Sequence, residues 1–315
     1  MPLIGTAEIM TAAARAGHGA AAFNVIQLEH AEAIIAGAGA AQAPVILQIS
    51  ENATRYHGAL APLGRAVLAA AGAASVPASV HLDHATSEAL VREAIALGFS
   101  SVMFDASALG YQDNVKATAD LTRLCHDSGV WVEAELGEIG GKDGVHAAGA
   151  RTDPVEAAAY VAVTGVDALA VAVGTSHAML TRDARLDFDL IRALHAAVPV
   201  PLVLHGSSGV ADADLVRAVA CGITKVNIAT HLNRAFTESV RKYLAAHPAA
   251  VDTRAYLGAG RDSVAVEVAR LLGILLPHDE TTVMLGGSGT SAGKSAFPGE
   301  SDYQIEWECE DHDRD

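Results

Sequence analysis

Three histidines, His84, His177 and His205, each lie shortly after a short apolar run and could together hold a metal ion. Imidazole nitrogens bind zinc readily, and a catalytic zinc site keeps one coordination position open for a substrate oxygen. The sequence therefore predicts one zinc site made by these three side chains. Asp83 directly precedes His84, and a carboxylate beside a cation stays ionised near neutral pH, so we expect Asp83 to act as a base toward a substrate hydroxyl.

Two further carboxylates, Asp105 and Glu135, follow other apolar runs and could support the same site. They could hydrogen-bond the metal-binding histidines and fix their orientation, or they could be ligands of a second metal position. We favour the hydrogen-bonding role for both of them.

Two segments of small residues have the composition of a phosphate-binding site. The first reads HGSSG at 205–209, and the second reads NIAT at 227–230. Small residues expose backbone N–H groups, hydroxyls add donors, and the N-terminus of a following helix favours an anion. An ordinary turn explains either segment taken alone, but together they predict a phosphate cradle. Its residues are Gly206, Ser207, Ser208, Asn227, Ile228, Ala229 and Thr230.

Eight short apolar runs alternate with helical segments over the first 275 residues, and we predict that they are the strands of one parallel sheet. Nearly continuous apolar runs are expected where helices cover both faces of such a sheet. The predicted strands are 20–25, 45–49, 78–82, 101–104, 130–134, 168–173, 202–204 and 225–228. Eight strands alternating with helices over about 250 residues are typical of a (β/α)8 TIM barrel, an α/β fold. A doubly wound open sheet remains the alternative.

The predicted barrel accounts for the placement of the polar residues, because barrel enzymes build their active sites at the carboxyl ends of the strands. Six consecutive predicted strands, from the third to the eighth, each end in a metal-binding or hydrogen-bonding residue, which core packing does not explain. His81 alternates with Leu82 in the third strand, so we expect it to face the barrel wall rather than the metal. Asp153 followed by Pro154 predicts the start of a helix.

Composition and charge narrow the classes of function. The 315 residues are 51 % hydrophobic and 18 % charged, which supports a large core, and the net charge is −16. The sequence shows no basic patch that would neutralise nucleic-acid phosphates, so we predict no nucleic-acid partner. The last forty residues are acidic and contain a Gly/Ser-rich stretch. We therefore predict one barrel domain at 1–275 and a flexible, acidic C-terminal extension at 276–315.

The start of the chain and its cysteines indicate a cytoplasmic protein. The first residues show no basic segment followed by an apolar one, and the chain has no run of about 18 apolar residues, so we expect neither a signal peptide nor a membrane span. The three cysteines, Cys125, Cys221 and Cys309, show no metal-binding spacing and are too few for a disulfide framework.

The motifs that carry these residues resemble those of class II, zinc-dependent fructose-bisphosphate aldolases, of the shorter branch that includes tagatose-bisphosphate aldolases. The resemblance covers about residues 1–272, with the motifs in the family's order. They are AFN at 22–24, HLDH at 81–84, MFDAS at 103–107, VEAELG at 132–137 with GG at 140–141, TGVDALAVAVGTSH at 164–177, PLVLHGSSG at 201–209 and TKVNIAT at 224–230.

The resemblance implies a reversible cleavage of a ketose bisphosphate into dihydroxyacetone phosphate and an aldehyde, with zinc stabilising the enediolate. It favours fructose 1,6-bisphosphate, which yields glyceraldehyde 3-phosphate in glycolysis; tagatose 1,6-bisphosphate or another phosphoketose is the alternative. It places one zinc per subunit on His84, His177 and His205, and it implies that Asp83 takes the proton of the C4 hydroxyl. It also implies a homo-oligomer, either a dimer or a tetramer.

The resemblance further implies which residues bind the two ends of the substrate. The dihydroxyacetone phosphate end would be held by Gly206, Ser208, Asn227 and Thr230. Ser50 matches a phosphate-contacting serine of longer family members. Arg254 matches an arginine that reaches the second phosphate, in a site that can belong to a neighbouring subunit.

Two positions depart from the family's pattern. The family's mobile loop carries a glutamate that moves a proton of dihydroxyacetone phosphate, and the aligned residue is Asp143, which is one methylene shorter. The glycine that usually follows the second zinc histidine is Ala178. Because the backbone of that glycine helps to bind phosphate and a monovalent cation, we expect both contacts to be altered. We expect the loop to close further, or the role of Asp143 to be weaker.

The residues leave three other functions open. A Schiff-base aldolase needs an active-site lysine, and Lys225, which is the only lysine on a predicted strand, opens the eighth strand at the end away from the site. A metal-dependent hydrolase barrel would typically carry a His-x-His pair on its first strand, where this chain has Phe23 and Asn24. A non-catalytic protein that kept the barrel is expected only if the three histidines bind no metal.

Overall fold

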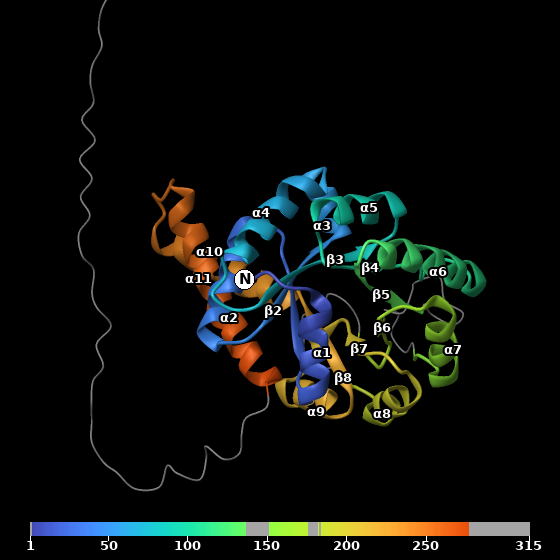
Figure 1. Cartoon of the computed structure of the whole chain (residues 1–315). Helices are drawn as coiled ribbons and strands as arrows, with labels where there is room; N and C mark the ends of the chain where they lie inside the picture. The colour runs from blue at the N-terminus through green and yellow to red at the C-terminus, as the bar shows by residue number, and fades with distance from the viewer. Residues whose placement is uncertain (1, 137–150, 176–181, 183, 277–315) are drawn as a thin grey trace, which may run out of the picture. The chain divides into compact units, whose positions relative to one another are not determined.

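A computed structural model describes residues 2–136, 151–175, 182 and 184–276, and its eight parallel strands close into one barrel (Figure 1). The strands follow one another in chain order, and β1 pairs with β8 to close the sheet. Their bounds are β1 Ala20–Asn24, β2 Val45–Ser50, β3 Ala78–Ala85, β4 Ser101–Phe104, β5 Trp131–Glu135, β6 Ala168–Ala170, β7 Leu202–Leu204 and β8 Ile223–Ile228. The predicted (β/α)8 barrel is confirmed, and the open sheet is excluded.

Each predicted strand coincides with an observed one, with small differences at the ends. Strand β3 continues to Ala85 rather than ending at Leu82, and β8 begins at Ile223, two residues before its predicted start. Strand β6 is shorter than predicted, since it ends at Ala170. The apolar runs located the strands because their outward side chains, such as Phe23, pack under the helices in one buried cluster.

The inward side chains change from apolar to polar toward the carboxyl ends of the strands. Successive side chains of a strand point to opposite faces, so Ile46, Gln48 and Ser50 of β2 share the inward face. Ile46 packs near the amino-terminal end of the barrel, whereas Gln48 and Ser50 line a cavity at the other end. Glu133 of β5 meets Lys225 of β8 inside the barrel, although these strands are not neighbours in the sheet.

Helices connect the strands and surround the barrel (Figure 1). Helix α7 begins as predicted, because the Asp153 side chain accepts hydrogen bonds from two backbone N–H groups of its first turn. The bounds of the helices are α1 Thr6–Ala16, α2 Leu28–Ala41, α3 Glu51–His57, α4 Leu60–Gly72, α5 Glu88–Leu97, α6 Tyr111–Asp127, α7 Pro154–Thr164, α8 Phe188–Ala197, α9 Asp212–Ala220, α10 Thr230–Ala246 and α11 Thr253–Leu275.

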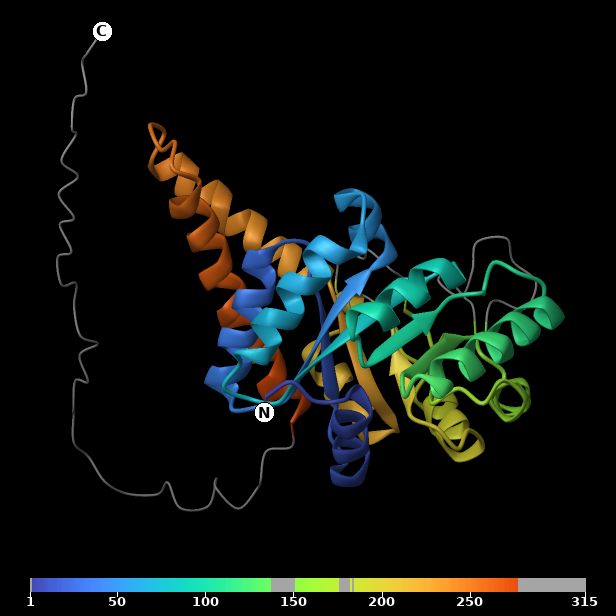
Figure 2. The same cartoon turned by 45° about the horizontal axis from the view of Figure 1, so that its top comes forward.

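Helix α1 covers the amino-terminal end of the barrel (Figure 2). Its first residue, Thr6, is fully buried, and its hydroxyl oxygen lies 3.0 Å from Ser79 Oγ and 2.6 Å from Ser101 Oγ. Ile9 and Met10 of the same helix pack against the inward side chains nearest the amino-terminal ends of the strands. These contacts shield the lower barrel interior from water.

Helices α10 and α11 form a hairpin, and α11 lies along α2 (Figures 1 and 2). Two glycines permit this close packing. A Cβ atom on Gly37 of α2 would lie 2.5 Å from the carbonyl oxygen of Ala265 and 2.7 Å from Val268 Cβ. A Cβ atom on Gly260 of α11 would lie 2.8 Å from the ring of Phe236 in α10. The hairpin is therefore held against the barrel's helical layer by backbone contact that larger residues would prevent.

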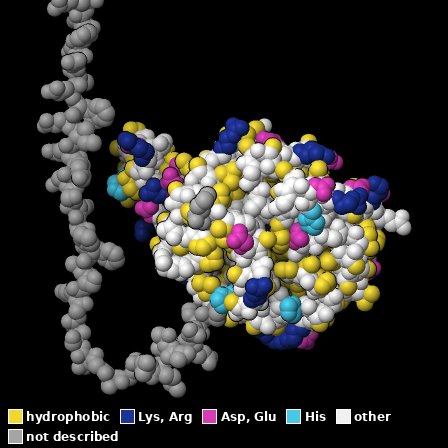
Figure 3. Space-filling view, viewed as in Figure 1, with side chains coloured by type: hydrophobic (Ala, Val, Ile, Leu, Met, Phe, Trp, Pro, Cys, Tyr) yellow, Lys and Arg dark blue, Asp and Glu magenta, His cyan; other side chains and the backbone are white. Residues whose placement is uncertain are grey.

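Charges of both signs are interspersed on the part of the surface that Figure 3 shows. On the face seen in Figure 3, Lys and Arg side chains lie apart from one another, several of them next to Asp or Glu. Ion pairs such as Arg92–Glu88 and Lys116–Asp120 form along single helices. None of the described helices has the length and apolar character needed to cross a membrane.

Replacing Gly37 by alanine should lower the free energy of unfolding by about 1–3 kcal/mol, because the added methyl group overlaps α11. Urea titrations of the purified variants would measure this loss. The control is Gly273→Ala in α11, whose Cβ would meet nothing within 4 Å and which should be neutral or stabilising by about 0.5–1 kcal/mol. Equal stability of the Gly37→Ala variant and the unsubstituted protein would contradict the tight packing of α2 on α11.

Candidate active site

A cavity of about 170 Å³ lies at the carboxyl ends of the strands, where many predicted site residues meet. Concave sites of this kind, with converging polar groups, are the usual location of a barrel's active site. All of the lining residues except Asn24, Gln48 and Asn52 belong to the site predicted from the sequence. The lining consists of Asn24, Gln48, Ser50, Asn52, Asp83, His84, Gly206, Ser207, Ser208, Asn227, Ala229 and Thr230.

His84 reaches this cavity through an irregularity of β3. Alternation turns Asp83 into the barrel, so a regular strand would turn the next residue outward. The pairing of β3 with β4 instead shifts between Leu82 and Ala85, and His84 adopts a positive φ of 51°. A left-handed backbone is uncommon for a residue other than glycine and is often found at functional sites. It lets consecutive residues, Asp83 and His84, both face the cavity.

His205 faces His84 across the upper barrel. The two rings lie at an interplanar angle of 84°, and His205 Nδ1 is 3.0 Å from His84 Nε2. The other nitrogen of each ring contacts a carboxylate: His84 Nδ1 lies 2.8 Å from Asp105 Oδ2, and His205 Nε2 lies 2.9 Å from Glu133 Oε1. An ionised carboxylate only accepts hydrogen bonds, so these outer nitrogens are donors. The facing nitrogens can then share a proton or bind a cation.

Carboxylates make the surroundings of His84 favourable to positive charge. Burial by itself disfavours the imidazolium, but the charge of Asp83 and the hydrogen bond to Asp105 outweigh it and raise the pKa of His84 to about 10. Although burial opposes it, the same hydrogen bond holds the pKa of Asp105 well below its ordinary value. Burial, followed by the charge of Asp105, raises the pKa of Glu135 well above its ordinary value. The site therefore attracts a cation or a proton.

The side chains of His84, Glu135 and His205 offer ligand atoms that lie within 4.8 Å of one another. Two imidazole nitrogens and a carboxylate oxygen form a donor set that suits zinc. Glu135 is among the residues that could hold the ion, whereas Asp105 hydrogen-bonds His84. The third predicted histidine, His177, lies outside the described residues.

Asp83 is buried and is held by a chain of amides. Asn24 Nδ2 donates to Asp83 Oδ2 at 3.0 Å, and Asn227 Nδ2 donates to Oδ1 at 3.4 Å. Gln48 Nε2 donates to Asn24 Oδ1 at 2.7 Å, which fixes the orientation of the Asn24 amide. The carboxylate is therefore presented to the cavity next to His84, in a position to accept a proton from a bound hydroxyl.

The turns that follow β7 and β8 line the other side of the cavity. Gly206 adopts a φ of 66°, which glycine tolerates, and precedes a short 3-10 turn. The Ser207 hydroxyl donates to the carbonyl oxygen of Asn227 at 2.6 Å and so ties the two turns together. Ser208 lines the cavity together with Thr230, the first residue of α10, and the N-terminus of a helix favours an anion. This side of the cavity can hold a phosphate group.

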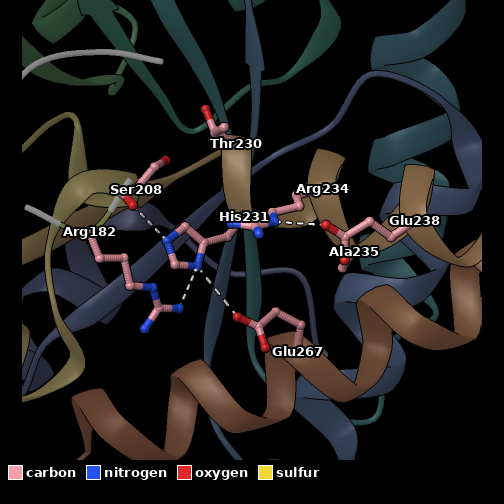
Figure 4. Close-up of a pocket in the computed structure, with 8 residues that line it drawn as sticks. All are labelled: Arg182, Ser208, Thr230, His231, Arg234, Ala235, Glu238 and Glu267. Atoms are coloured by element: carbon pink, nitrogen blue, oxygen red, sulfur yellow. Dashed lines mark hydrogen bonds and ion pairs between the residues drawn. The ribbon is translucent and has the colours of Figure 1, made fainter. Parts of the chain in front are cut away.

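A second cavity, of about 270 Å³, lies behind the turn that contains Ser208 (Figure 4). His231 Nε2 donates to the carbonyl oxygen of Ser208 at 3.1 Å, while Nδ1 lies 3.2 Å from Arg182 Nη2 and 3.4 Å from Glu267 Oε1. Burial by itself would raise the pKa of Glu267, but hydrogen bonds from Arg270 and His231 lower it to about 2. The hydrogen bond from His231, which is itself held by Arg182 and Glu267, therefore supports the Ser208 turn from outside the first cavity.

Several predicted site residues are not brought to the cavity by the described structure. Asp143 and Ala178, like His177, lie outside the described residues. Arg254 is the second residue of α11. Its exposed guanidinium forms an ion pair with Asp252, with Nη2 2.7 Å from Oδ2. The Ile228 side chain packs in the apolar core, so any contact of this residue with a ligand would come from its backbone.

Sequence reasoning missed two buried charges inside the barrel, Glu133 and Lys225, which meet at 2.6 Å. Lys225 was predicted to open the eighth strand, at the end away from the site; this start was wrong, since β8 begins at Ile223, and the lysine points into the barrel. The spacing of these two residues from predicted site residues could have revealed that they point into the barrel. Glu133 lies two residues from Glu135, and Lys225 lies two residues from Asn227, and residues two apart in a strand share a face.

The sequence matches known proteins over most of its length. The family described as fructose-bisphosphate aldolase class-II matches residues 4–279. A protein of Bacillus subtilis (strain 168) named probable fructose-bisphosphate aldolase is 38 % identical over 268 residues, which are 84 % of this chain and 94 % of that protein.

Solved structures share the fold. The YdjI aldolase from Escherichia coli K12 superposes with a TM-score of 0.78 at 30 % identity, covering 87 % of this chain and 97 % of that one. A fructose-bisphosphate aldolase from Campylobacter jejuni gives a TM-score of 0.75 and coverages of 87 % and 95 %; its 23 % identity supports the fold alone. The matches and the barrel-end cavity agree that the chain belongs to the class II fructose-bisphosphate aldolase family and is an aldolase of the carbon–carbon lyase type.

Proposed function

We propose that this aldolase cleaves fructose 1,6-bisphosphate reversibly into dihydroxyacetone phosphate and glyceraldehyde 3-phosphate, with zinc as its metal. One observation carries the proposal: the facing nitrogens of His84 and His205, 3.0 Å apart, share the upper barrel with Asp83 and with the small-residue turn at Ser208. A cation site, a base and an anion site within one cavity are what cleavage of a phosphorylated ketose requires.

His84 and His205, joined by Glu135 or by His177, would hold the zinc ion. The outer nitrogens of the two described histidines are already held by Asp105 and Glu133, which leaves the facing nitrogens directed at the common centre. Zinc, when bound, supplies the positive charge that stabilises negative charge developing on the substrate oxygens.

In the direction of cleavage, Asp83 takes the proton of the substrate's C4 hydroxyl. The C3–C4 bond breaks as the C4 carbonyl forms, and its electron pair stays on the dihydroxyacetone phosphate half. The amides of Asn24 and Asn227 hold the Asp83 carboxylate in place for this transfer. We assign to Asp143 the return of a proton to C3, by its alignment with the family's loop glutamate.

The dihydroxyacetone phosphate end would lie on the turns after β7 and β8. Gly206, Ser208 and Thr230 offer backbone N–H groups, hydroxyls and the N-terminus of α10 there. Ser50, which also lines the cavity, would contact the second phosphate, as its match to a phosphate-contacting serine implies. Arg254 would reach that phosphate in a neighbouring subunit of a dimer or tetramer, which fits its exposed position on the α10–α11 hairpin.

We also propose that the enzyme works in the cytoplasm, in glycolysis or another route of carbohydrate metabolism. A bound monovalent cation and backbone contacts at Ala178, altered from those of the family's glycine, would complete the phosphate site. The remaining cradle positions, Ser207, Asn227, Ile228 and Ala229, would shape it through their backbone or through the hydrogen bond that joins its two turns.

The zinc protein should cleave fructose 1,6-bisphosphate, and a chelator should abolish the activity while borohydride should not. Asp83→Asn should lower kcat by about 10²–10⁴-fold, because the amide cannot accept the C4 proton. A coupled assay of released dihydroxyacetone phosphate measures both effects. Faster cleavage of tagatose 1,6-bisphosphate than of fructose 1,6-bisphosphate would overturn the proposed substrate but not the aldolase chemistry. Full activity in the presence of chelator would overturn the metal.

Asp143→Ala should slow the exchange of the dihydroxyacetone phosphate C3 proton with solvent, while the zinc content stays unchanged. The physical reason is the loss of the carboxyl group that would carry this proton. Proton exchange followed by NMR in deuterated water, beside metal analysis of the same sample, measures the two quantities. Exchange at the rate of the unsubstituted enzyme would remove Asp143 from the mechanism.

The metal-free protein should lose stability as the pH rises from about 6.5 toward 10. The pKa of His84 is raised to about 10 in the folded chain from an ordinary value of about 6.5, so its contribution is complete below 6.5 and lost as the pH passes 10. Urea unfolding of chelator-treated protein at several pH values measures the slope. His84→Asn should flatten it, and equal slopes for the two proteins would contradict the raised pKa.

A further inference from the structure

A buried ion pair lies inside the barrel directly below the candidate metal site. Glu133 of β5 and Lys225 of β8 both have side chains with no exposed surface, and Glu133 Oε2 lies 2.6 Å from Lys225 Nζ. Isolated charges are costly to bury, and a buried pair often stabilises a fold no better than apolar residues of the same size would. Its presence in an otherwise well-packed barrel therefore calls for a role other than packing.

The two oxygens of Glu133 have different partners. Oε2 faces Lys225, whereas Oε1 lies 2.9 Å from Nε2 of His205. His81 lies beside the pair, with Nε2 3.9 Å from Glu133 Oε2 and Nδ1 2.7 Å from Ser101 Oγ. His81 thus lies within the barrel interior, not at its wall as the sequence suggested, and burial lowers its pKa well below the ordinary value. Lys225 is the cation that directly contacts Glu133 in this layer.

The contact with Glu133 decides which nitrogen of His205 carries a hydrogen. The carboxylate requires a donor, so it selects the form with hydrogen on Nε2 and leaves the lone pair of Nδ1 directed at His84 Nε2, 3.0 Å away. Asn227 Nδ2 lies 3.1 Å from the same Nε2 and would favour the opposite form, in which that nitrogen accepts. The charge of Glu133 settles this competition.

Lys225 in turn determines how Glu133 is presented. Its ammonium occupies Oε2 and balances the carboxylate's charge, so that Oε1 alone is directed at His205. Every polar atom in this short chain is fully or almost fully buried, so water does not compete for these contacts. The chain runs from Lys225 through Glu133 to His205, a candidate metal ligand.

We propose that Glu133 and Lys225 are a positioning pair that fixes the tautomer and ring orientation of His205 for metal binding, an inference that rests on the proposed metal site. Neither residue lines the described cavity or contacts the substrate position. Their effect on the reaction would pass entirely through the metal ligand. Removing such a partner typically weakens metal binding by about 10–100-fold.

The test compares Glu133→Gln, Lys225→Met and the double variant that carries both changes with the unsubstituted protein. Each is measured in two states: thermal unfolding of the metal-free chain, and the dissociation constant and visible absorption of bound Co(II) by competition with a chelator. Thr164→Val is the matched control, because it removes a buried hydroxyl that bonds the Tyr160 carbonyl outside the barrel interior.

Glu133→Gln should weaken Co(II) binding by about 10–100-fold and change the absorption bands, which report ligand geometry. Lys225→Met should lower the melting temperature by about 5 °C or more, since it leaves the buried carboxylate of Glu133 without its cationic partner. The double variant, with both charges removed, should regain most of that loss in melting temperature while its Co(II) affinity stays low. Thr164→Val should lower the melting temperature without changing the absorption bands.

A pair that only stabilises the fold would behave differently. In that case the double variant would regain both melting temperature and Co(II) affinity, or Glu133→Gln would bind Co(II) within about twofold of the unsubstituted protein, and either result would overturn the positioning role. If the unsubstituted protein binds Co(II) and cleaves substrate while these results are seen, the proposed function stands and this inference alone fails. If the unsubstituted protein binds no metal, both fail together.

Discussion

Pairing of β1 with β8 closes the sheet, and the site depends on that closure. Glu133 and Lys225 come from strands that are not adjacent, so they meet only because the sheet returns on itself. With α1 across the amino-terminal end, the inward charges have little access to water from below and must find partners inside. The same closure gathers the strands' carboxyl ends, so side chains from four strands, together with the turns after β7 and β8, line one cavity.

Charge is unevenly distributed in this interior. Asp83, Asp105, Glu133 and Glu135 converge on the upper barrel, where Lys225 is the one permanently charged cation among the described residues that meet them. Burial, followed by the charge of Asp105, raises the pKa of Glu135, and the neighbouring carboxylates outweigh burial to raise the pKa of His84, so both groups favour their protonated forms in the absence of metal. A divalent cation would replace these protons. The preference for a metal therefore follows from the balance of buried charges as well as from the histidines.

The cavity is supported from outside as well as from below. The Ser208 turn receives a hydrogen bond from His231, which is itself held between Arg182 and Glu267. A change at these outer residues would reach the Ser208 side of the cavity through the backbone. The turn at Gly206–Ser208 has only small side chains, so the contacts behind it contribute to holding its shape.

The sequence by itself determined the eight strands and the polar residues at their carboxyl ends, because each strand's apolar run is a local pattern that a parallel sheet requires. It left an open, doubly wound sheet as an alternative, and only the pairing of β1 with β8 decided the closed order. It did not reveal the turn of His84 into the cavity, since the bulge in β3 and the positive φ depend on pairing with β4. Nor did it show that Glu133 meets Lys225, 92 residues away, because such contacts exist only when distant strands close around one interior. Local spacing identifies a residue's face, but only the tertiary structure decides its partner.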